Sequence, residues 1–217
     1  MAGGDRMQDE SLTGFLDALA SERPTPGGGG AAAVIGAVGA ALVSMVCNLT
    51  VGKSAYADVE PEVRALLEDA EKLRRRLLRL AAEDVEAFQG VMASYRLPRA
   101  TDEEKQARSA AIQEALRRAT ETPLACAEVC SRLLRLSYAI TQKGNRNVIS
   151  DAGVAALAVA AALRSAALNV HVNTGAIRDA DFVEAAHRRL QESLSGSDEL
   201  LEETYRKVRH RMEGEGA

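Results

Sequence analysis

Apolar residues recur at intervals of three and four positions along most of this chain, and no segment shows the strict alternation of a β-strand. Short polar segments and segments with glycine or proline separate these runs. The predicted helices span residues 11–20, 31–49, 60–95, 101–118, 122–142, 151–170 and 179–205. The pattern therefore predicts an all-α fold.

Two signals divide the middle of the chain. Thr101 with Glu104 forms a capping box, which can start a helix. Thr122 and Pro123 supply a cap and a first helical position. We therefore predict that a separate helix begins there.

Two of the predicted helices are rich in small apolar residues. Residues 31–49 carry no charge, and their length approaches the roughly 20 residues of a membrane span. Alanine and glycine outnumber large apolar residues, and Gly36, Ala40 and Ser44 repeat at four-residue spacing, which favours close helix packing over lipid insertion. Residues 151–170 are again alanine-rich. We predict that both are buried helices of a bundle, packed on each other or on a second copy in a dimer, and that the protein does not enter a membrane.

Composition narrows the class of protein. With 217 residues and 47% hydrophobic content, the chain suits one domain at residues 1–217, with frayed ends at about 1–8 and 213–217. Aromatic residues make up only 3% and the net charge is −4, so nucleic acid is not an expected partner. The start of the chain is mixed polar and charged, without a signal peptide, which predicts a cytoplasmic location.

Cysteine and histidine residues show no pattern that predicts a metal site. Cys126 and Cys130 stand four positions apart without further ligands nearby in sequence, and with Cys47 they are interpreted as core thiols. A basic run at residues 72–76 has acidic neighbours that include Asp84, so we interpret this stretch as a solvated helix face. We expect neither a metal nor a tightly bound cofactor.

A glycine-rich loop precedes the first apolar helix. Residues 24–30 are Pro-Thr-Pro-Gly-Gly-Gly-Gly, and glycine lets main-chain N–H groups approach a bound group closely. A helix that starts after the loop would direct its N-terminal dipole toward the same ligand. The alternative is a mobile linker, although the prolines stiffen its entry. We predict a ligand cradle with four candidate substrate-binding residues, Pro26, Gly27, Gly28 and Gly29.

A second polar segment, residues 143–151, lies between two predicted helices. Gly144 can end one helix in the left-handed conformation, and Ser150 or Asp151 can cap the next, so helix capping explains part of the segment. Two amides, two cations and a carboxylate exceed what capping needs, which makes a binding surface the other interpretation. Further polar residues stand near the ends of the apolar helices, at Asn48, Lys53, Asn169 and Asn173.

Three ordered motifs together resemble the cyclodeaminase/cyclohydrolase family, which includes the cyclodeaminase domain of formiminotransferase-cyclodeaminase. They are the loop at residues 24–29, the run Asn-Leu-Thr-Val-Gly-Lys at residues 48–53, and residues 143–153 with Lys-Gly-Asn-Arg-Asn and Ser-Asp-Ala-Gly. The chain departs from the family pattern at Gly30, where serine is usual, and after Asn173, where a basic residue is common. The ordered set is more specific than any one motif.

This resemblance implies an all-α, dimeric enzyme that acts on one-carbon derivatives of tetrahydrofolate. The leading hypothesis is formiminotetrahydrofolate cyclodeaminase, which converts 5-formiminotetrahydrofolate to 5,10-methenyltetrahydrofolate and ammonia. The alternative within the family is methenyltetrahydrofolate cyclohydrolase, which interconverts the methenyl and 10-formyl forms with water. The alternative from another class is a non-catalytic bundle that binds folate or serves as a structural dimer.

The resemblance also suggests roles for residues. Ring closure needs a base for the N10 proton and an acid for the departing ammonia, and the catalytic candidates are Lys53, partly desolvated by the alanine-rich helix, and Asp151. The simpler interpretation is a solvated lysine and a helix-capping aspartate. The amides are candidates for binding the pterin edge or for fixing the reacting group, and the cations for the substrate's glutamate carboxylates. The candidate substrate-binding residues of this second group are Asn48, Lys143, Asn145, Arg146, Asn147 and Asn173.

Overall fold

The computed structural model describes residues 11–213, and every regular element in this range is helical. The all-α prediction is therefore confirmed. Frayed ends were predicted at 1–8 and 213–217. Residues 1–8 and 214–217 lie outside the described residues, and the prediction is wrong for Glu213, which is the last residue of a helix. The elements are α1 (Leu12–Leu19), α2 (Gly28–Asn48), η1 (Ser54–Val59), α3 (Glu60–Tyr95), α4 (Asp102–Lys143), η2 (Arg146–Val148), α5 (Ile149–Thr174), α6 (Ala180–Leu194) and α7 (Ser197–Glu213).

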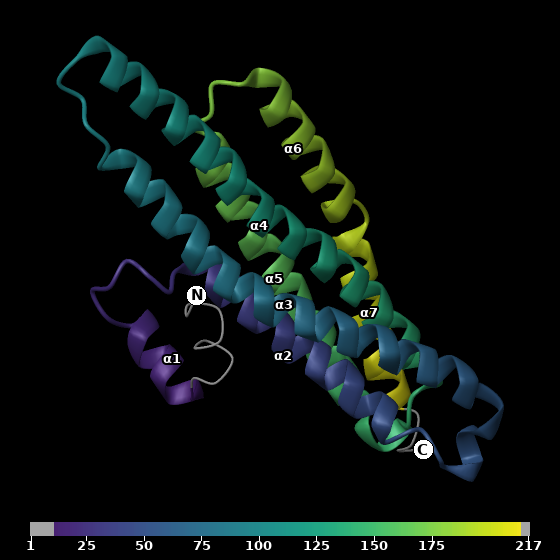
Figure 1. The fold of residues 1–217 in the computed structure, drawn as a ribbon. Helices are drawn as coiled ribbons and strands as arrows, with labels where there is room; N and C mark the ends of the chain where they lie inside the picture. Colours follow the sequence, from purple (N-terminus) through teal and green to yellow (C-terminus); the bar gives the residue numbers. More distant parts are fainter. Residues whose placement is uncertain (1–10, 214–217) are drawn as a thin grey trace.

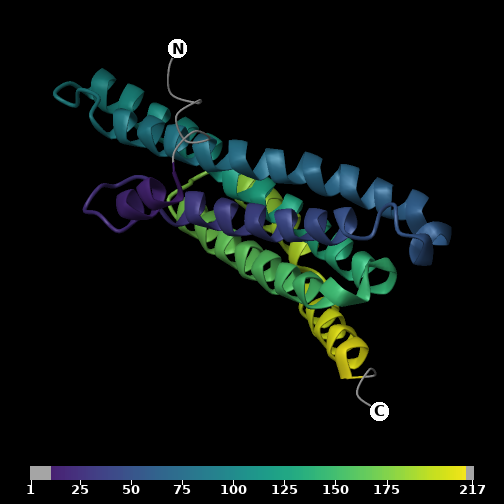
Figure 2. The same ribbon diagram turned by 90° about the horizontal axis from the view of Figure 1, so that it is seen from below.

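Four long helices form an elongated bundle (Figure 1). Around the bundle, α2 packs on α3, α3 on α4, α4 on α5, and α5 on α2. The helices α6 and α7 cover the side made by α4 and α5, while α1 stands apart at the end of the glycine-rich segment (Figures 1 and 2). The layout leaves α2 and α5 side by side along one face of the molecule (Figure 2).

Small residues allow α2 and α5 to approach closely. A Cβ atom on Gly39 would lie 2.5 Å from Val159 Cγ2 and 3.1 Å from the carbonyl oxygen of Ala155, so the backbone of α2 runs directly against α5. Ala40 and Ala155 are fully buried at the same contact. The prediction that the two alanine-rich helices pack on each other is confirmed.

The same two stretches are long and apolar enough to cross a membrane. They are residues 28–48 and 146–174, and 61% and 56% of their apolar windows are buried inside the bundle. Such burial is typical of core helices. The three cysteines are buried free thiols, as expected for core residues, and burial raises the pKa of Cys47 to about 12.

The prediction of two helices at 101–118 and 122–142 is wrong, because α4 continues through Pro123 over 42 residues. Proline has no N–H to donate to the carbonyl four positions earlier, which belongs to Ala119. In the structure the side chain of Asn173 on α5 donates to this carbonyl at 2.8 Å. A tertiary hydrogen bond thus replaces the missing helical one.

The end of the chain differs in the opposite sense. One helix was predicted for residues 179–205, but the structure has two, α6 and α7, separated at Ser195 and Gly196. Gly196 has a φ of 69°, a conformation that glycine adopts without steric cost. Beyond the break, α7 continues along the bundle in the same general direction as α6 and packs on both α4 and α5 (Figure 1).

Candidate functional site

The predicted site residues lie at opposite ends of the bundle. The 21 residues of α2 separate the glycine loop from Asn48 by about 30 Å at 1.5 Å per residue. We call the first group the glycine end (Pro26, Gly27, Gly28, Gly29 and Asn173) and the second the lysine end (Asn48, Lys53, Lys143, Asn145, Arg146, Asn147 and Asp151). A single copy of the chain therefore does not bring the two groups together.

The glycine end encloses a cavity of about 310 Å³. The first helical turn of α2 begins within the glycines, three residues earlier than predicted, so its N-terminus borders this space. Pro26 is half-buried next to the lining, and the neighbouring Thr25–Pro26 peptide is cis. The lining residues are Pro24, Thr25, Gly27, Gly28, Gly29, Asp84, Ala87, Phe88, Val91, Ala119, Asn169, Val172 and Asn173.

Asp84 was not among the predicted site residues, because its neighbours in the sequence suggested a solvated helix face. Its Oδ2 accepts a 2.9 Å hydrogen bond from the N–H of Gly30 in the first turn of α2. Burial raises the pKa of Asp84, and the bond from Gly30 lowers it less strongly. The signal available in the sequence was the spacing of Asp84, Phe88 and Val91, which share one face of α3.

Two amides on α5 face the same cavity. Asn173 uses its Nδ2 for the carbonyl of Ala119, and Asn169 donates to the carbonyl of Ser165 at 2.9 Å. The amide oxygen of each side chain can accept a further hydrogen bond. Asn173 was predicted as a binding residue, and its contact with α4 adds a structural role.

At the lysine end, Asn145 joins the α4–α5 connection to the end of α2. It is only 4% exposed; its N–H donates to Thr50 Oγ1 at 2.9 Å and its Nδ2 to the carbonyl of Leu49 at 2.8 Å. Its Oδ1 accepts from the N–H of Asn147 at 3.1 Å. These contacts use the polar groups of Asn145 to hold the loop.

The cations of this end differ in their surroundings. Lys143 pairs with Glu62 on α3, and the N–H of Arg146 donates to Tyr56 Oη at 3.1 Å. Lys53 is exposed at the start of η1, so the predicted desolvation by the alanine-rich helix does not occur within one copy. Asn48 and Asn147 are exposed as well.

Two predictions about helix capping in this loop are wrong. Gly144 has a φ of −72° and is extended, because Asn145 immediately leaves the helix direction to reach α2. Val148, rather than Ser150 or Asp151, precedes α5, since η2 fills the connection. Asp151 is half-buried in the first turn of α5, where its charge suits the helix dipole.

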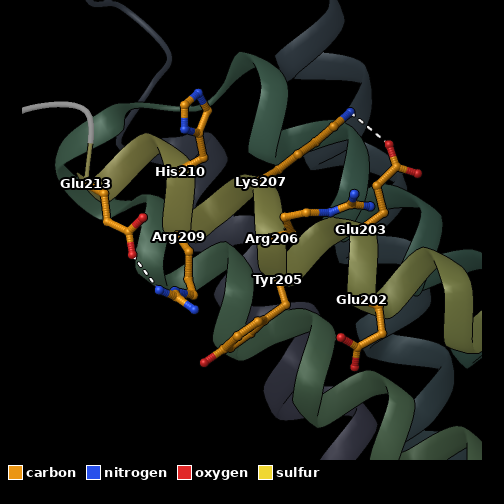
Figure 3. A pocket seen from close by; sticks show the side chains of 8 residues that line it. All are labelled: Glu202, Glu203, Tyr205, Arg206, Lys207, Arg209, His210 and Glu213. Atoms are coloured by element: carbon orange, nitrogen blue, oxygen red, sulfur yellow. Dashed lines mark hydrogen bonds and ion pairs between the residues drawn. The ribbon is translucent and has the colours of Figure 1, made fainter.

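A broad hollow of about 950 Å³ lies elsewhere, along α7 (Figure 3). Its described lining residues all come from this one helix, and two ion pairs, Lys207 with Glu203 at 3.1 Å and Arg209 with Glu213 at 2.6 Å, run along it. A surface of this kind does not converge on a ligand. Among residues 11–213, no three metal-ligating side chains form a cluster.

Comparisons with known proteins find folate enzymes among the relatives of this chain. The sequence pattern described as formiminotransferase-cyclodeaminase matches residues 11–192. A methenyltetrahydrofolate cyclohydrolase from Methylorubrum extorquens is 53% identical over 94% of this chain and 98% of its own length. The mouse formimidoyltransferase-cyclodeaminase is 34% identical over 86% of this chain, which spans 34% of that protein.

A solved structure is also similar. The crystal structure of formiminotetrahydrofolate cyclodeaminase from Thermotoga maritima superposes with a TM-score of 0.80 at 33% identity, and covers 95% of this chain and 98% of its own. Fold, motif order and near-full-length identity thus lead to one conclusion, that the chain belongs to the formiminotransferase-cyclodeaminase family.

Proposed function

We propose that the protein is a methenyltetrahydrofolate cyclohydrolase that acts on a tetrahydrofolate derivative as its substrate. The observation that carries this proposal is the 53% identity to the Methylorubrum cyclohydrolase over almost the whole of both chains. Identity to the cyclodeaminases is lower, 34% for the mouse protein and 33% for the Thermotoga protein. Cyclodeaminase activity is therefore the second candidate, and a non-catalytic folate-binding bundle the third.

The reaction needs one base and one acid. Water attacks the methenyl carbon between N5 and N10, and a base takes one of its two protons. The second proton leaves the hydroxyl group as the C=O bond forms, while an acid protonates N5 and the carbon–N5 bond breaks. The products are the 10-formyl group and one released proton. Asp151 and Lys53 are the chain's candidates for these two roles. Arg146 is the candidate for a glutamate carboxylate of the substrate, while Asn48 and Asn147 offer hydrogen bonds near the reacting carbon.

We further propose that a dimer unites the two ends. Large apolar side chains stay exposed along the face formed by α2 and α5, where Val38 is 53%, Leu157 46% and Leu168 68% exposed. A second copy that packs on this face would cover them. If the two copies run antiparallel, the glycine end of one lies against the lysine end of the other, and Lys53 becomes desolvated.

Other parts of the proposal follow from the bundle. Its apolar helices are mostly buried, which suits a cytoplasmic protein without a membrane partner. The net charge of −4 gives no general attraction for nucleic acid. The residues proposed for catalysis perform proton transfer themselves, so no resident cofactor is required.

Absorbance spectroscopy tests the proposal. The methenyl chromophore of 5,10-methenyltetrahydrofolate should decay faster with protein than without it. A parallel sample of 5-formiminotetrahydrofolate should stay unchanged, whereas gain of the methenyl chromophore with ammonia release would identify a cyclodeaminase. If neither absorbance change occurs, the non-catalytic folate-binding bundle is the remaining candidate.

A further inference from the structure

The cavity at the glycine end holds a carboxylate that the proposed proton transfers do not use. Asp84, Phe88 and Val91 stand at positions i, i+4 and i+7 of α3, and all three line the cavity. Asn169 and Asn173 stand at i and i+4 of α5 and line it as well. Its volume of about 310 Å³ lies at the lower end of the range for small-molecule pockets, which suits one ring system better than a whole folate.

The glycine loop fixes the position of this carboxylate. A Cβ atom on Gly29 would lie only 2.1 Å from Asp84 Oδ1, so the absence of a side chain at Gly29 allows Asp84 to reach the loop. The same atom on Gly28 would lie 3.8 Å from Asn169, an ordinary contact. A side chain at residue 29 would therefore displace the carboxylate of Asp84.

Asp84 keeps capacity for further hydrogen bonds. A carboxylate has about four lone-pair sites, and the N–H of Gly30 occupies one of them at Oδ2. Burial raises the pKa of Asp84 in spite of that bond, so the ionised form is under-solvated among the described residues. A ligand with two parallel N–H donors would supply what this carboxylate lacks.

The pterin ring of a folate carries such a donor pair, N3–H and the 2-amino group, along one edge of a flat bicycle. We infer that the glycine-end cavity is the pterin subsite, where Asp84 accepts hydrogen bonds from N3–H and the 2-amino group and Phe88 packs against the ring. This inference rests on the proposed function for the class of substrate. Phe88 is 36% exposed at the cavity, which leaves its ring available for that contact.

The subsite also determines how the substrate lies. The pterin enters the glycine end of one copy, and its N5 and N10 then face the mouth of the cavity, where Val172 is 75% exposed on the α2–α5 face. The lysine end of a second copy supplies the acid and base there. The amides of the lysine end are thereby assigned to the reacting group rather than to the pterin edge.

The alternative is that Asp84 only caps the N-terminus of α2. Calorimetric titration with folic acid, and with its analogue that has hydrogen in place of the 2-amino group, separates the two roles. The unmodified protein should bind folic acid at least about tenfold more tightly, since a hydrogen bond to a charged group is lost with the analogue. Equal affinity for the two ligands would overturn the inference without any variant.

Variants sharpen the test. Asp84→Asn keeps a carbonyl oxygen for the N–H of Gly30 but offers only one acceptor, so the preference for folic acid should fall to about twofold or less. Glu86→Gln makes the same chemical change on the exposed side of α3 and should retain the full preference. Phe88→Leu should weaken both ligands alike. If Asp84→Asn keeps the full preference for folic acid over the analogue, the inference is wrong.

Turnover measured on the same preparations separates this inference from the proposed function. Turnover of methenyltetrahydrofolate without discrimination between the two ligands would refute the pterin subsite alone. Discrimination that depends on Asp84, without turnover of the methenyl or formimino substrate, would support the subsite and refute the proposed reaction.

Discussion

At the scale of single residues, a polar side chain is a better functional candidate when its hydrogen-bonding groups are not all used within the chain. Asn145 uses its N–H, Nδ2 and Oδ1 for Thr50, Leu49 and Asn147, so its role in the described structure is to hold the loop. Lys53 is exposed and Asp151 half-buried. These two residues are accessible for chemistry in a way that Asn145 is not.

Lys53→Met and Asp151→Asn should each lower turnover of methenyltetrahydrofolate by at least about a hundredfold, the usual range for loss of an acid or base. Their free energies of unfolding should change by less than about 1 kcal/mol, because Lys53 is exposed and Asp151 loses only its interaction with the helix dipole. Asn145→Ala should show the opposite balance, with about 1–3 kcal/mol lost because Leu49 and Thr50 lose their buried partner. Near-normal turnover in either of the first two variants would remove that residue from the mechanism.

The pKa of Asp84 gives a second prediction. Burial raises it above its ordinary value of 3.8, so the folded chain binds this proton more tightly than the unfolded chain. The bound proton therefore stabilises the folded protein. This contribution is fully present below pH 3.8 and is lost as the pH rises through the folded-state pKa. Asp84→Asn has no such proton. The free energy of unfolding of Asp84→Asn, measured in urea, should therefore rise relative to that of the unmodified protein between pH 4 and pH 7. A difference that stays constant with pH would contradict the prediction.

At the scale of elements, the contact between α2 and α5 requires glycine at residue 39. Gly39→Ala should destabilise the protein by about 1–3 kcal/mol, because the new methyl group would overlap Val159 and press on the backbone of α5. Gly90→Ala is the matched control inside α3, where nothing lies within 4 Å of the new atom. That variant should gain about 0.5–1 kcal/mol from helix propensity. Thermal unfolding followed by circular dichroism measures both, and equal effects would contradict the close approach.

The passage of α4 through Pro123 gives another element-scale prediction. Asn173→Ala removes the donor to the carbonyl of Ala119 and should cost about 1–3 kcal/mol. In a Pro123→Ala background the helix supplies its own N–H to that carbonyl, so the same Asn173→Ala change should cost less. A double-mutant cycle of unfolding free energies measures this coupling. Additive effects would show that Asn173 does not compensate for the proline.

At the scale of the whole molecule, local patterns predicted the helices but could not predict where they break or which charges are buried. The bounds of α3 follow from its periodicity, and the packing of α2 on α5 follows from their small residues. Where α4 passes Pro123 its free carbonyl accepts from Asn173, and the half-buried Asp84 accepts from the N–H of Gly30, a partner 54 positions away in the sequence. Since such pairings form only after the helices pack, the sequence placed Asp84 on a solvated face.

The separation of the glycine and lysine ends by about 30 Å makes the dimer the last prediction. Light scattering should give twice the mass of the chain, and Val38→Glu, which puts a charge on the α2–α5 face, should give monomers without turnover. Met212→Glu, at an exposed apolar residue of α7, should remain dimeric and active.

Subunit mixing then tests whether the site is shared. Lys53→Met and Gly29→Ala should each be inactive alone, because the first removes a proton-transfer group and the second displaces Asp84. In an antiparallel dimer, a mixed pair holds one site with both defects and one site with neither. Random mixing produces such pairs in about half of the dimers, so turnover should recover to about a quarter of that of the unmodified protein. No recovery, with mixed pairs shown by mass spectrometry, would mean that the glycine end of one copy and the lysine end of the other do not form one site, and would overturn the antiparallel dimer.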